Sequence, residues 1–331
     1  MNPGADGPAR TFRPAQADRT SGADVPRPDP LCIGAPHQWG NRHNEGDTMR
    51  NWKAWAAGAL ASCALAAPAA AQQLYVFTSG WMGGFPKAAL QAGAVGNFGD
   101  NVPVSFYIYK SPKGVVMFDC GMNDKLITDA AGWWGPLAKG FGVKMTKDDS
   151  IPALLAKIGL KPSDIKYLVL GHMHLDHAGN MGQFPNATVV VQEEEVKAAL
   201  APDIGFSVYY IPGDFADIKN QNVLRLNGDL DLFGDGSFRI VSARGHTTGS
   251  QFAVVRLPKT GSVILTSDVV YLKENLDKNL LPPVPGVTHP IEAYKSYQRV
   301  RQIRDTENAK IFYGHDPEVF KQTKVAPEFY D

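Results

Sequence analysis

The chain has 331 residues, of which 44% are hydrophobic, so it is long enough to bury a substantial core. Its 33 basic residues balance its 33 acidic residues, which excludes the basic electrostatic footprint expected of a nucleic-acid-binding protein. We therefore expect a globular protein whose partner is a small molecule and not a nucleic acid.

Two segments at the start of the chain are expected to lie outside the folded domain. Residues 1–48 are rich in Pro, Gly, Arg and Asp without apolar periodicity, which predicts a disordered segment or an upstream segment that is not translated. Residues 49–71 resemble a secretory signal peptide, with a short basic start, an apolar run and a small-residue cleavage site before Gln72. Because such signals act at an N-terminus, translation from Met49 is the simpler interpretation, and a genuine extension from Met1 is the alternative.

The signal segment predicts export, so we expect the mature protein to be periplasmic or secreted. The run Leu60-Ala61-Ser62-Cys63 also resembles a bacterial lipobox, and in that alternative the protein would be anchored by lipid on Cys63. The apolar run is too short to cross a bilayer comfortably, so we expect no integral membrane span in the mature chain. Cys120 is the sole cysteine after Gln72, which excludes an internal disulfide in that chain.

Residues 72–331 are expected to form one folded domain in which short strands alternate with helices. A helix is expected from Asp149-Ser150 to Ile158. This order of elements predicts layered sheets and helices, an α/β (α+β) fold, and not an all-helical fold. Strands are expected at 104–109, 115–118, 165–170, 223–226, 238–242, 252–257, 263–266 and 311–313, and further helices at 193–200 and 291–303.

The segment His172-Met173-His174-Leu175-Asp176-His177 directly follows one of the predicted strands. Three imidazoles and a carboxylate so close together are costly to bury without a cation. This donor set favours Zn²⁺ or a similar first-row divalent ion, whereas Ca²⁺ and Mg²⁺ prefer oxygen ligands. A surface histidine cluster is the alternative, but His246, Asp268 and His315 each follow a predicted strand and complete a two-metal ligand set.

This H-x-H-x-D-H motif, followed by an isolated His, an Asp and a His, resembles the metallo-β-lactamase superfamily over residues 74–331. The resemblance implies an αββα sandwich with two divalent metal ions, zinc being favoured, at one edge between two sheets. By the same resemblance, one ion would be held by His172, His174 and His246, the second by Asp176, His177 and His315, and Asp268 would bridge the two.

Narrower features are similar to the N-acyl-homoserine lactonases. True metallo-β-lactamases usually lack a bridging carboxylate at the position of Asp268, whereas glyoxalase-II-like thioesterases, lactonases and organophosphate hydrolases keep it. Tyr271 follows Asp268 by three residues, as in the lactonases, and the runs 272–275, 312–316 and 327–330 are also similar. The alternative interpretation of Tyr271 is a packed core aromatic.

The resemblance implies an enzyme that opens the ring of N-acyl-homoserine lactones by attack of a metal-bridging hydroxide. Tyr271 would donate to the carbonyl oxygen or developing oxyanion, and Asp176 or Asp268 would carry the proton to the leaving alkoxide. The alternatives are another hydrolase on the same scaffold (a thioesterase, an organophosphate hydrolase or a promiscuous β-lactamase) and a non-catalytic periplasmic metal-binding protein. The sequence carries no signal of oligomeric state.

The family's usual Asp-Thr-Gly is replaced here by Asp119-Cys120-Gly121. We expect Asp119 to orient a ligand histidine, and Cys120 to be a small buried residue and not a nucleophile. Trp133 and Trp134 belong to a segment that we expect to be a Gly-interrupted loop. They would either line an apolar channel for the acyl chain or cover the core.

Overall fold

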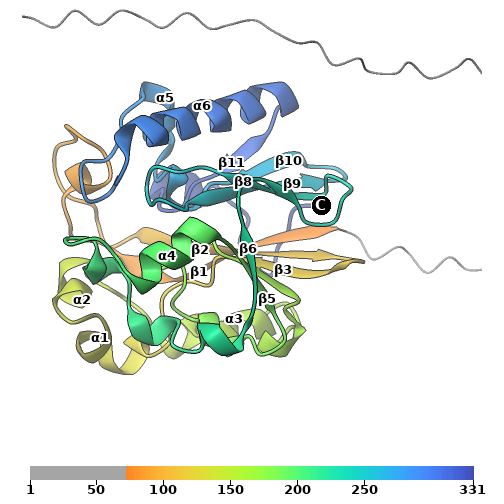
Figure 1. The fold of residues 1–331 in the computed structure, drawn as a ribbon, viewed down its shortest axis with the longest axis horizontal. Coiled ribbons are helices and arrows are strands. Elements are labelled where there is room, and N and C mark those ends of the chain that lie inside the picture. The colour runs from red at the N-terminus through yellow and green to blue at the C-terminus, as the bar shows by residue number, and fades with distance from the viewer. Residues whose placement is uncertain (1–71) are drawn as a thin grey trace, which may run out of the picture. The chain divides into compact units, whose positions relative to one another are not determined.

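The computed structural model describes residues 72–331. The expectations for residues 1–48 and for the signal segment 49–71 therefore lie outside the described part. In the described part, two sheets lie against each other and helices cover their outer faces (Figure 1). This arrangement confirms the expected αββα fold class. No helix within residues 72–331 is both long and apolar enough to cross a membrane.

The first sheet has six strands in the order β1-β2-β3-β4-β5-β6. The pairs β1–β2 and β2–β3 are antiparallel, whereas β3, β4, β5 and β6 run parallel. The carboxyl ends of β3 and β4 therefore lie at the same edge. The six strands are β1 (Gln73–Met82), β2 (Val102–Ser111), β3 (Gly114–Phe118), β4 (Tyr167–Val169), β5 (Thr188–Gln192) and β6 (Asn222–Leu226).

The second sheet has five strands in the order β11-β10-β9-β8-β7. Only β10 and β11 are parallel neighbours within this sheet, and the other pairs are antiparallel. Because β9 runs opposite to both of its neighbours, β8, β10 and β11 point the same way and end at the same edge. The five strands are β7 (Leu230–Asp231), β8 (Phe238–Ser242), β9 (Gln251–Leu257), β10 (Gly261–Leu265) and β11 (Lys310–Phe312).

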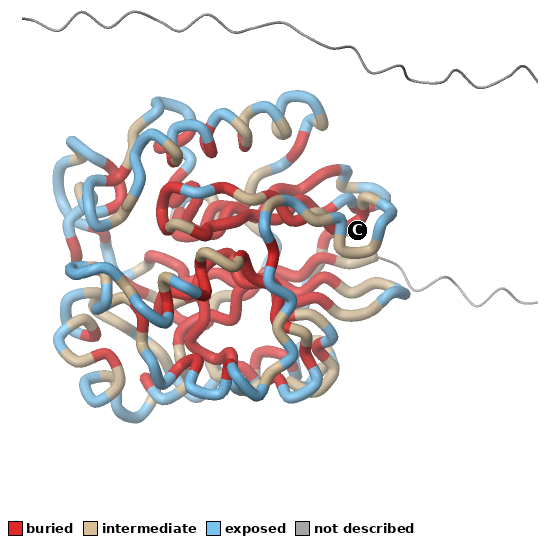
Figure 2. The backbone as a smooth tube through the Cα atoms, viewed as in Figure 1, coloured by how far each residue is buried: buried red, intermediate tan, exposed pale blue. Residues whose placement is uncertain are grey.

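Buried residues are concentrated in the two sheets and in the helix faces that touch them (Figure 2). Between the sheets, the rings of Tyr107 in β2 and Phe312 in β11 stack with centroids 6.1 Å apart. Leu155 and Val196 pack on the outer face of the first sheet, and Tyr297 packs on the outer face of the second.

The helices are α1 (Leu126–Trp134), α2 (Pro136–Gly140), α3 (Ile151–Ala156), α4 (Glu193–Leu200), α5 (Lys273–Lys278), α6 (Pro290–Glu307) and α7 (Pro317–Phe320). Short 3-10 turns lie at 87–89, 147–149, 162–164, 181–183, 207–209, 212–214, 218–220 and 267–269.

The expectation of a loop around Trp133 and Trp134 was wrong, because this segment forms the helices α1 and α2. Gly135 has a φ of 57°, which ends α1, and Pro136 restarts the chain as the first residue of α2. Trp134 is buried in the core under these helices, so it covers the core. Trp133 is half-buried, and its Nε1 donates a hydrogen bond of 2.9 Å to Asp214.

Candidate metal centre

Four strand ends from the two sheets meet at one edge of the sandwich, and the predicted ligands follow them. β4 leads into the motif 172–177, and β8, β10 and β11 lead to His246, Asp268 and His315. The structure brings all seven predicted side chains into three overlapping groups, and within each group the potential ligand atoms lie within 4.8 Å of one another. The groups are His172 with His174 and His246, His172 with His177 and Asp268, and Asp176 with His177 and His315.

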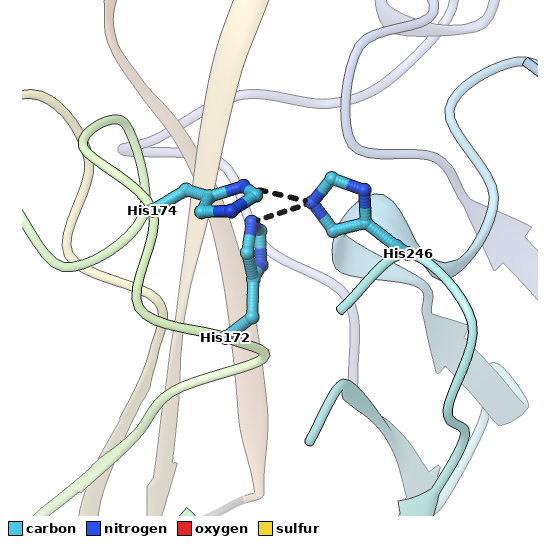
Figure 3. A group of neighbouring side chains, drawn as sticks. All are labelled: His172, His174 and His246. Atoms are coloured by element: carbon cyan, nitrogen blue, oxygen red, sulfur yellow. Dashed lines mark hydrogen bonds between the residues drawn. The ribbon is translucent and has the colours of Figure 1, made fainter. Parts of the chain in front are cut away.

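Three histidines form the first half of the site (Figure 3). The Nε2 atom of His246 lies 2.9 Å from Nε2 of His172 and 3.0 Å from Nδ1 of His174. Burial, followed by the neighbouring imidazoles, holds the pKa of both His172 and His174 well below the ordinary value. Neutral rings whose lone pairs converge in this way form a ligand set for a cation such as Zn²⁺.

The second half of the site combines two histidines with two carboxylates. The Oδ1 atom of Asp268 lies 3.2 Å from Nε2 of His177 and 3.1 Å from Nε2 of His315. Asp176 approaches the same two nitrogens at 3.6 and 3.4 Å. Despite this proximity, His177 Nε2 and Asp268 Oδ1 are buried and form no hydrogen bond with any residue in 72–331. Buried polar atoms without a partner need another positive or polar group, and a metal ion fits this donor set.

Asp268 faces both halves of the site. While its Oδ1 atom points to His177 and His315, its Oδ2 atom lies 3.5 Å from His246 and 3.8 Å from His172. One carboxylate therefore faces side chains of both halves, which is the arrangement that a residue bridging two metal ions requires. The residues present thus suit two metal ions.

The second half of the site also requires positive charge on electrostatic grounds. Burial lowers the pKa of His315, but the carboxylates of Asp268 and Asp176 outweigh burial and raise it to about 10. The same carboxylates hold the pKa of His177 well above its ordinary value against the opposing effect of burial. Burial raises the pKa of Asp268, but His177 and His315 reverse this effect and hold it well below the ordinary range. Two buried carboxylates are stable here only beside positive charge, whether protons or metal ions supply it.

Hydrogen bonds on the far side of three histidine rings determine which nitrogen faces the centre. The Nδ1 atoms of His177, His246 and His315 lie 2.9, 2.9 and 2.8 Å from Asp119 Oδ2, the Gly286 carbonyl and the Pro103 carbonyl. An acceptor on Nδ1 leaves the Nε2 lone pair free to bind a metal ion. The contact expected between Asp119 and a ligand histidine is present in the structure.

Tight backbone turns hold these side chains at the edge. Asp119 and Ser267 have φ values of 57° and 47°, and a non-glycine residue in this left-handed region is strained by about 1–2 kcal/mol. Gly171 and Gly314 pack against Ser267. A Cβ atom at Gly171 would lie 2.3 Å from Ser267 Oγ, and one at Gly314 would lie 2.7 Å from Ser267 O. The loops that carry the ligands therefore approach one another closely because these two residues have no side chain.

Tyr271 is buried beside both halves of the site. Its ring stacks on His315 with centroids 5.7 Å apart, and its hydroxyl lies 3.0 Å from His246 Nδ1 and 3.3 Å from the Gly286 carbonyl. Burial, and then the charge of Asp268, raises the pKa of Tyr271 well above the ordinary value, so the phenol remains a neutral donor. The hydroxyl donates to the Gly286 carbonyl in this structure.

Cys120 has the environment of a packed residue. Its thiol is buried and donates to the His177 carbonyl at 3.2 Å. Burial raises its pKa well above the ordinary value, so the reactive thiolate is disfavoured.

Sequence reasoning missed Glu195, which is fully buried and contacts both loops of the three-histidine half. It stands in the run Glu193-Glu194-Glu195, where three identical side chains begin a helix. No pattern in the sequence distinguishes it from its two neighbours, which are partly exposed.

Replacing Asp119 by Asn should lower the affinity for the metal ion held by His177 by about 10- to 100-fold. Asp119 accepts from Gly171 N at 2.6 Å as well as from His177, and an amide has only one oxygen to serve these two donors. A competition titration with zinc measures the effect, with Asp148→Asn at an exposed position as the control. Unchanged affinity in Asp119→Asn would mean that His177 does not depend on this carboxylate.

Comparison with known proteins agrees with the site. The model of the metallo-β-lactamase superfamily matches residues 99–315. The N-acyl homoserine lactonase AttM of Azorhizobium caulinodans is 36% identical over 241 residues, which cover 71% of this chain and 90% of that protein. The N-acyl homoserine lactonase AiiA of Bacillus thuringiensis subsp. kurstaki is 30% identical over 230 residues, covering 69% of this chain and 87% of that protein.

A solved structure of similar fold is that of an N-acyl homoserine lactone hydrolase with the product N-hexanoyl-L-homoserine at its catalytic metal centre. It is 27% identical, has a TM-score of 0.69 and is matched over 78% of this chain and 99% of its own length. The superfamily that the sequence motif predicted is thus confirmed: the chain belongs to the metallo-β-lactamase superfamily, and its curated relatives include N-acyl homoserine lactonases.

Proposed function

We propose that this protein is a two-metal hydrolase that opens the lactone ring of N-acyl homoserine lactones. The observation that carries the proposal is the ligand set with Asp268 facing both halves and Tyr271 beside both. The similarity to N-acyl homoserine lactonases supports the choice of substrate. A metal-storage protein would need neither a carboxylate that contacts both halves nor a buried phenol next to them.

The seven ligands would hold two divalent ions, and we propose zinc because imidazole nitrogens dominate the donor set. When bound, such ions lower the pKa of water towards neutrality and polarise a carbonyl group. Tyr271 would donate a hydrogen bond to the oxyanion that develops on the lactone carbonyl, after its hydroxyl turns from the Gly286 carbonyl. Asp176 is better placed than Asp268 to carry the proton to the leaving alkoxide, because its side chain is 13% exposed against 5%.

A metal analysis combined with a substrate panel tests this function. Protein beginning at Gln72 should contain two ions per chain and should hydrolyse short- or long-chain N-acyl homoserine lactones faster than a thioester, a phosphotriester or a lactam. His174→Ala, Asp268→Ala and His315→Ala should each lose nearly all turnover and some stability, because metal binding contributes to folding. One ion or fewer after full loading would contradict the two-metal site, and a preference for another ester class would contradict the lactonase assignment.

Tyr271→Phe tests the residue that favours a lactonase over other hydrolases on this scaffold. We expect the variant to fold and keep both ions, but to turn over lactones about 10- to 1,000-fold more slowly, because one donor to the oxyanion is lost. Steady-state kinetics and metal content measure the two effects separately. Unchanged kcat and KM would show that Tyr271 is only a packing residue, whereas a loss of metal with normal turnover per loaded site would show that it only supports His246.

We also propose that the mature protein is exported. The basic start, the apolar run and the small residues before Gln72 support this proposal. Mass spectrometry of the protein from fractionated cells should find an N-terminus at Gln72, whereas an acylated N-terminus at Cys63 would support the lipid-anchored alternative. An intact chain from Met1 in the cytoplasm would refute export.

A further inference from the structure

Glu195 is a fully buried carboxylate outside the predicted ligand set. Its Oε1 atom accepts from Met173 N at 2.9 Å and from the Tyr210 hydroxyl at 3.2 Å. Its Oε2 atom accepts from the Thr247 hydroxyl at 2.5 Å and from Gly249 N at 3.2 Å. An ionised carboxylate accepts hydrogen bonds and donates none, so these four donors match its chemistry completely.

Each of the four donors is attached to a segment that positions the three-histidine half of the site. Met173 lies between His172 and His174 in the first ligand loop, and Thr247 directly follows His246 in the second. The ring of Tyr210 packs edge-on against His174, with centroids 4.7 Å apart. Glu195 therefore ties together the two loops whose histidine nitrogens converge in Figure 3.

The backbone around Glu195 is shaped for this close approach. Gly249 packs directly on the first turn of α4, where an added Cβ would lie 2.2 Å from Glu195 N and 2.6 Å from its Cα. The neighbouring Glu194 points away and forms a surface ion pair with Lys197. The position of each residue within α4 thus decides that Glu195 is buried against the two loops, while the chemically identical Glu194 faces solvent.

We propose that Glu195 is a positioning residue for the metal ion held by His172, His174 and His246. Asp119 acts in the same way on the other half through His177, so each half of the site has its own buried carboxylate. A carboxylate is required because a neutral amide would direct a donor at groups that are themselves donors, and a shorter side chain would not span both loops. This inference rests on the proposed two-metal centre but not on the identity of the substrate.

The test compares Glu195→Gln with Glu194→Gln, which removes a charge from the adjacent, partly exposed position on the same helix. Competition titration of the metal-free proteins with zinc yields two dissociation constants, and long-range ¹⁵N NMR of the histidine rings identifies which imidazoles lose their metal bond. In Glu195→Gln, we expect the affinity for the ion bound by His172, His174 and His246 to fall by about 10- to 100-fold. The affinity for the other ion should not change. Glu194→Gln should match the unmodified protein.

Thr247→Val provides a second variant that keeps the size of the side chain and removes one donor to Glu195. It should lower the affinity for the same ion by a smaller factor, so the proposal remains testable if Glu195→Gln does not fold. Unchanged zinc constants in a folded Glu195→Gln protein, even with a lower unfolding temperature, would overturn the proposal, because they would show a role in stability alone. A lower affinity for the ion held by His177 and His315, with the other ion unaffected, would also overturn the proposal. Because zinc binding is measured directly, failure of lactone hydrolysis leaves this test unaffected.

Discussion

The structure depends on one electrostatic constraint: two carboxylates and five imidazoles are buried together at one edge of the sandwich. Asp268 is 5% exposed at its side chain and His177 is 1% exposed, so water cannot solvate the charge of either group effectively. Positive charge must therefore be present among these side chains, and the raised pKa of His315 beside the lowered pKa of Asp268 expresses the same requirement. Two divalent ions satisfy it while also using the convergent lone pairs of the other histidines.

The architecture meets this constraint by dividing the ligands between two sheets. The loop after β4 in the first sheet carries the histidine-rich motif, and the loops after β8, β10 and β11 in the second sheet carry His246, Asp268 and His315. The inter-sheet core, in which Tyr107 stacks on Phe312, holds the two sheets together and so sets the distance between the ligands that each sheet carries. The left-handed backbone at Ser267 then lets the ligand loops come close together. This conformation would be unfavourable alone, and the packed core around it keeps it in place.

Orientation of the ligands is a separate problem from their placement. An imidazole brought to the right point can still present the wrong nitrogen, so the acceptors behind His177, His246 and His315 are as much part of the centre as the rings. Tyr271 belongs to this layer, because its hydroxyl lies against His246 and its ring against His315. Substrate choice on such a scaffold is set by groups at the centre and its walls, because one fold supports many hydrolytic reactions.

The sequence by itself determined the layered fold class, the metal-binding motif and the partner residues at strand ends, because these are encoded locally. Periodicity marks strands, and histidines clustered after a strand need no distant contact to be recognised. The sequence did not reveal the helices α1 and α2 around Trp134, where a positive φ at Gly135 ends one helix and Pro136 begins the next despite the loop-like composition.

Only the tertiary structure distinguished Glu195 from Glu193 and Glu194, since its role arises from hydrogen-bond donors on loops up to 54 residues away. The hydrogen bond that holds the Tyr271 hydroxyl on the Gly286 carbonyl is likewise a product of packing. The candidate ligands, and Asp119 behind one of them, are thus legible in the sequence motif, whereas the supporting contacts of Glu195 become visible only when the chain is folded.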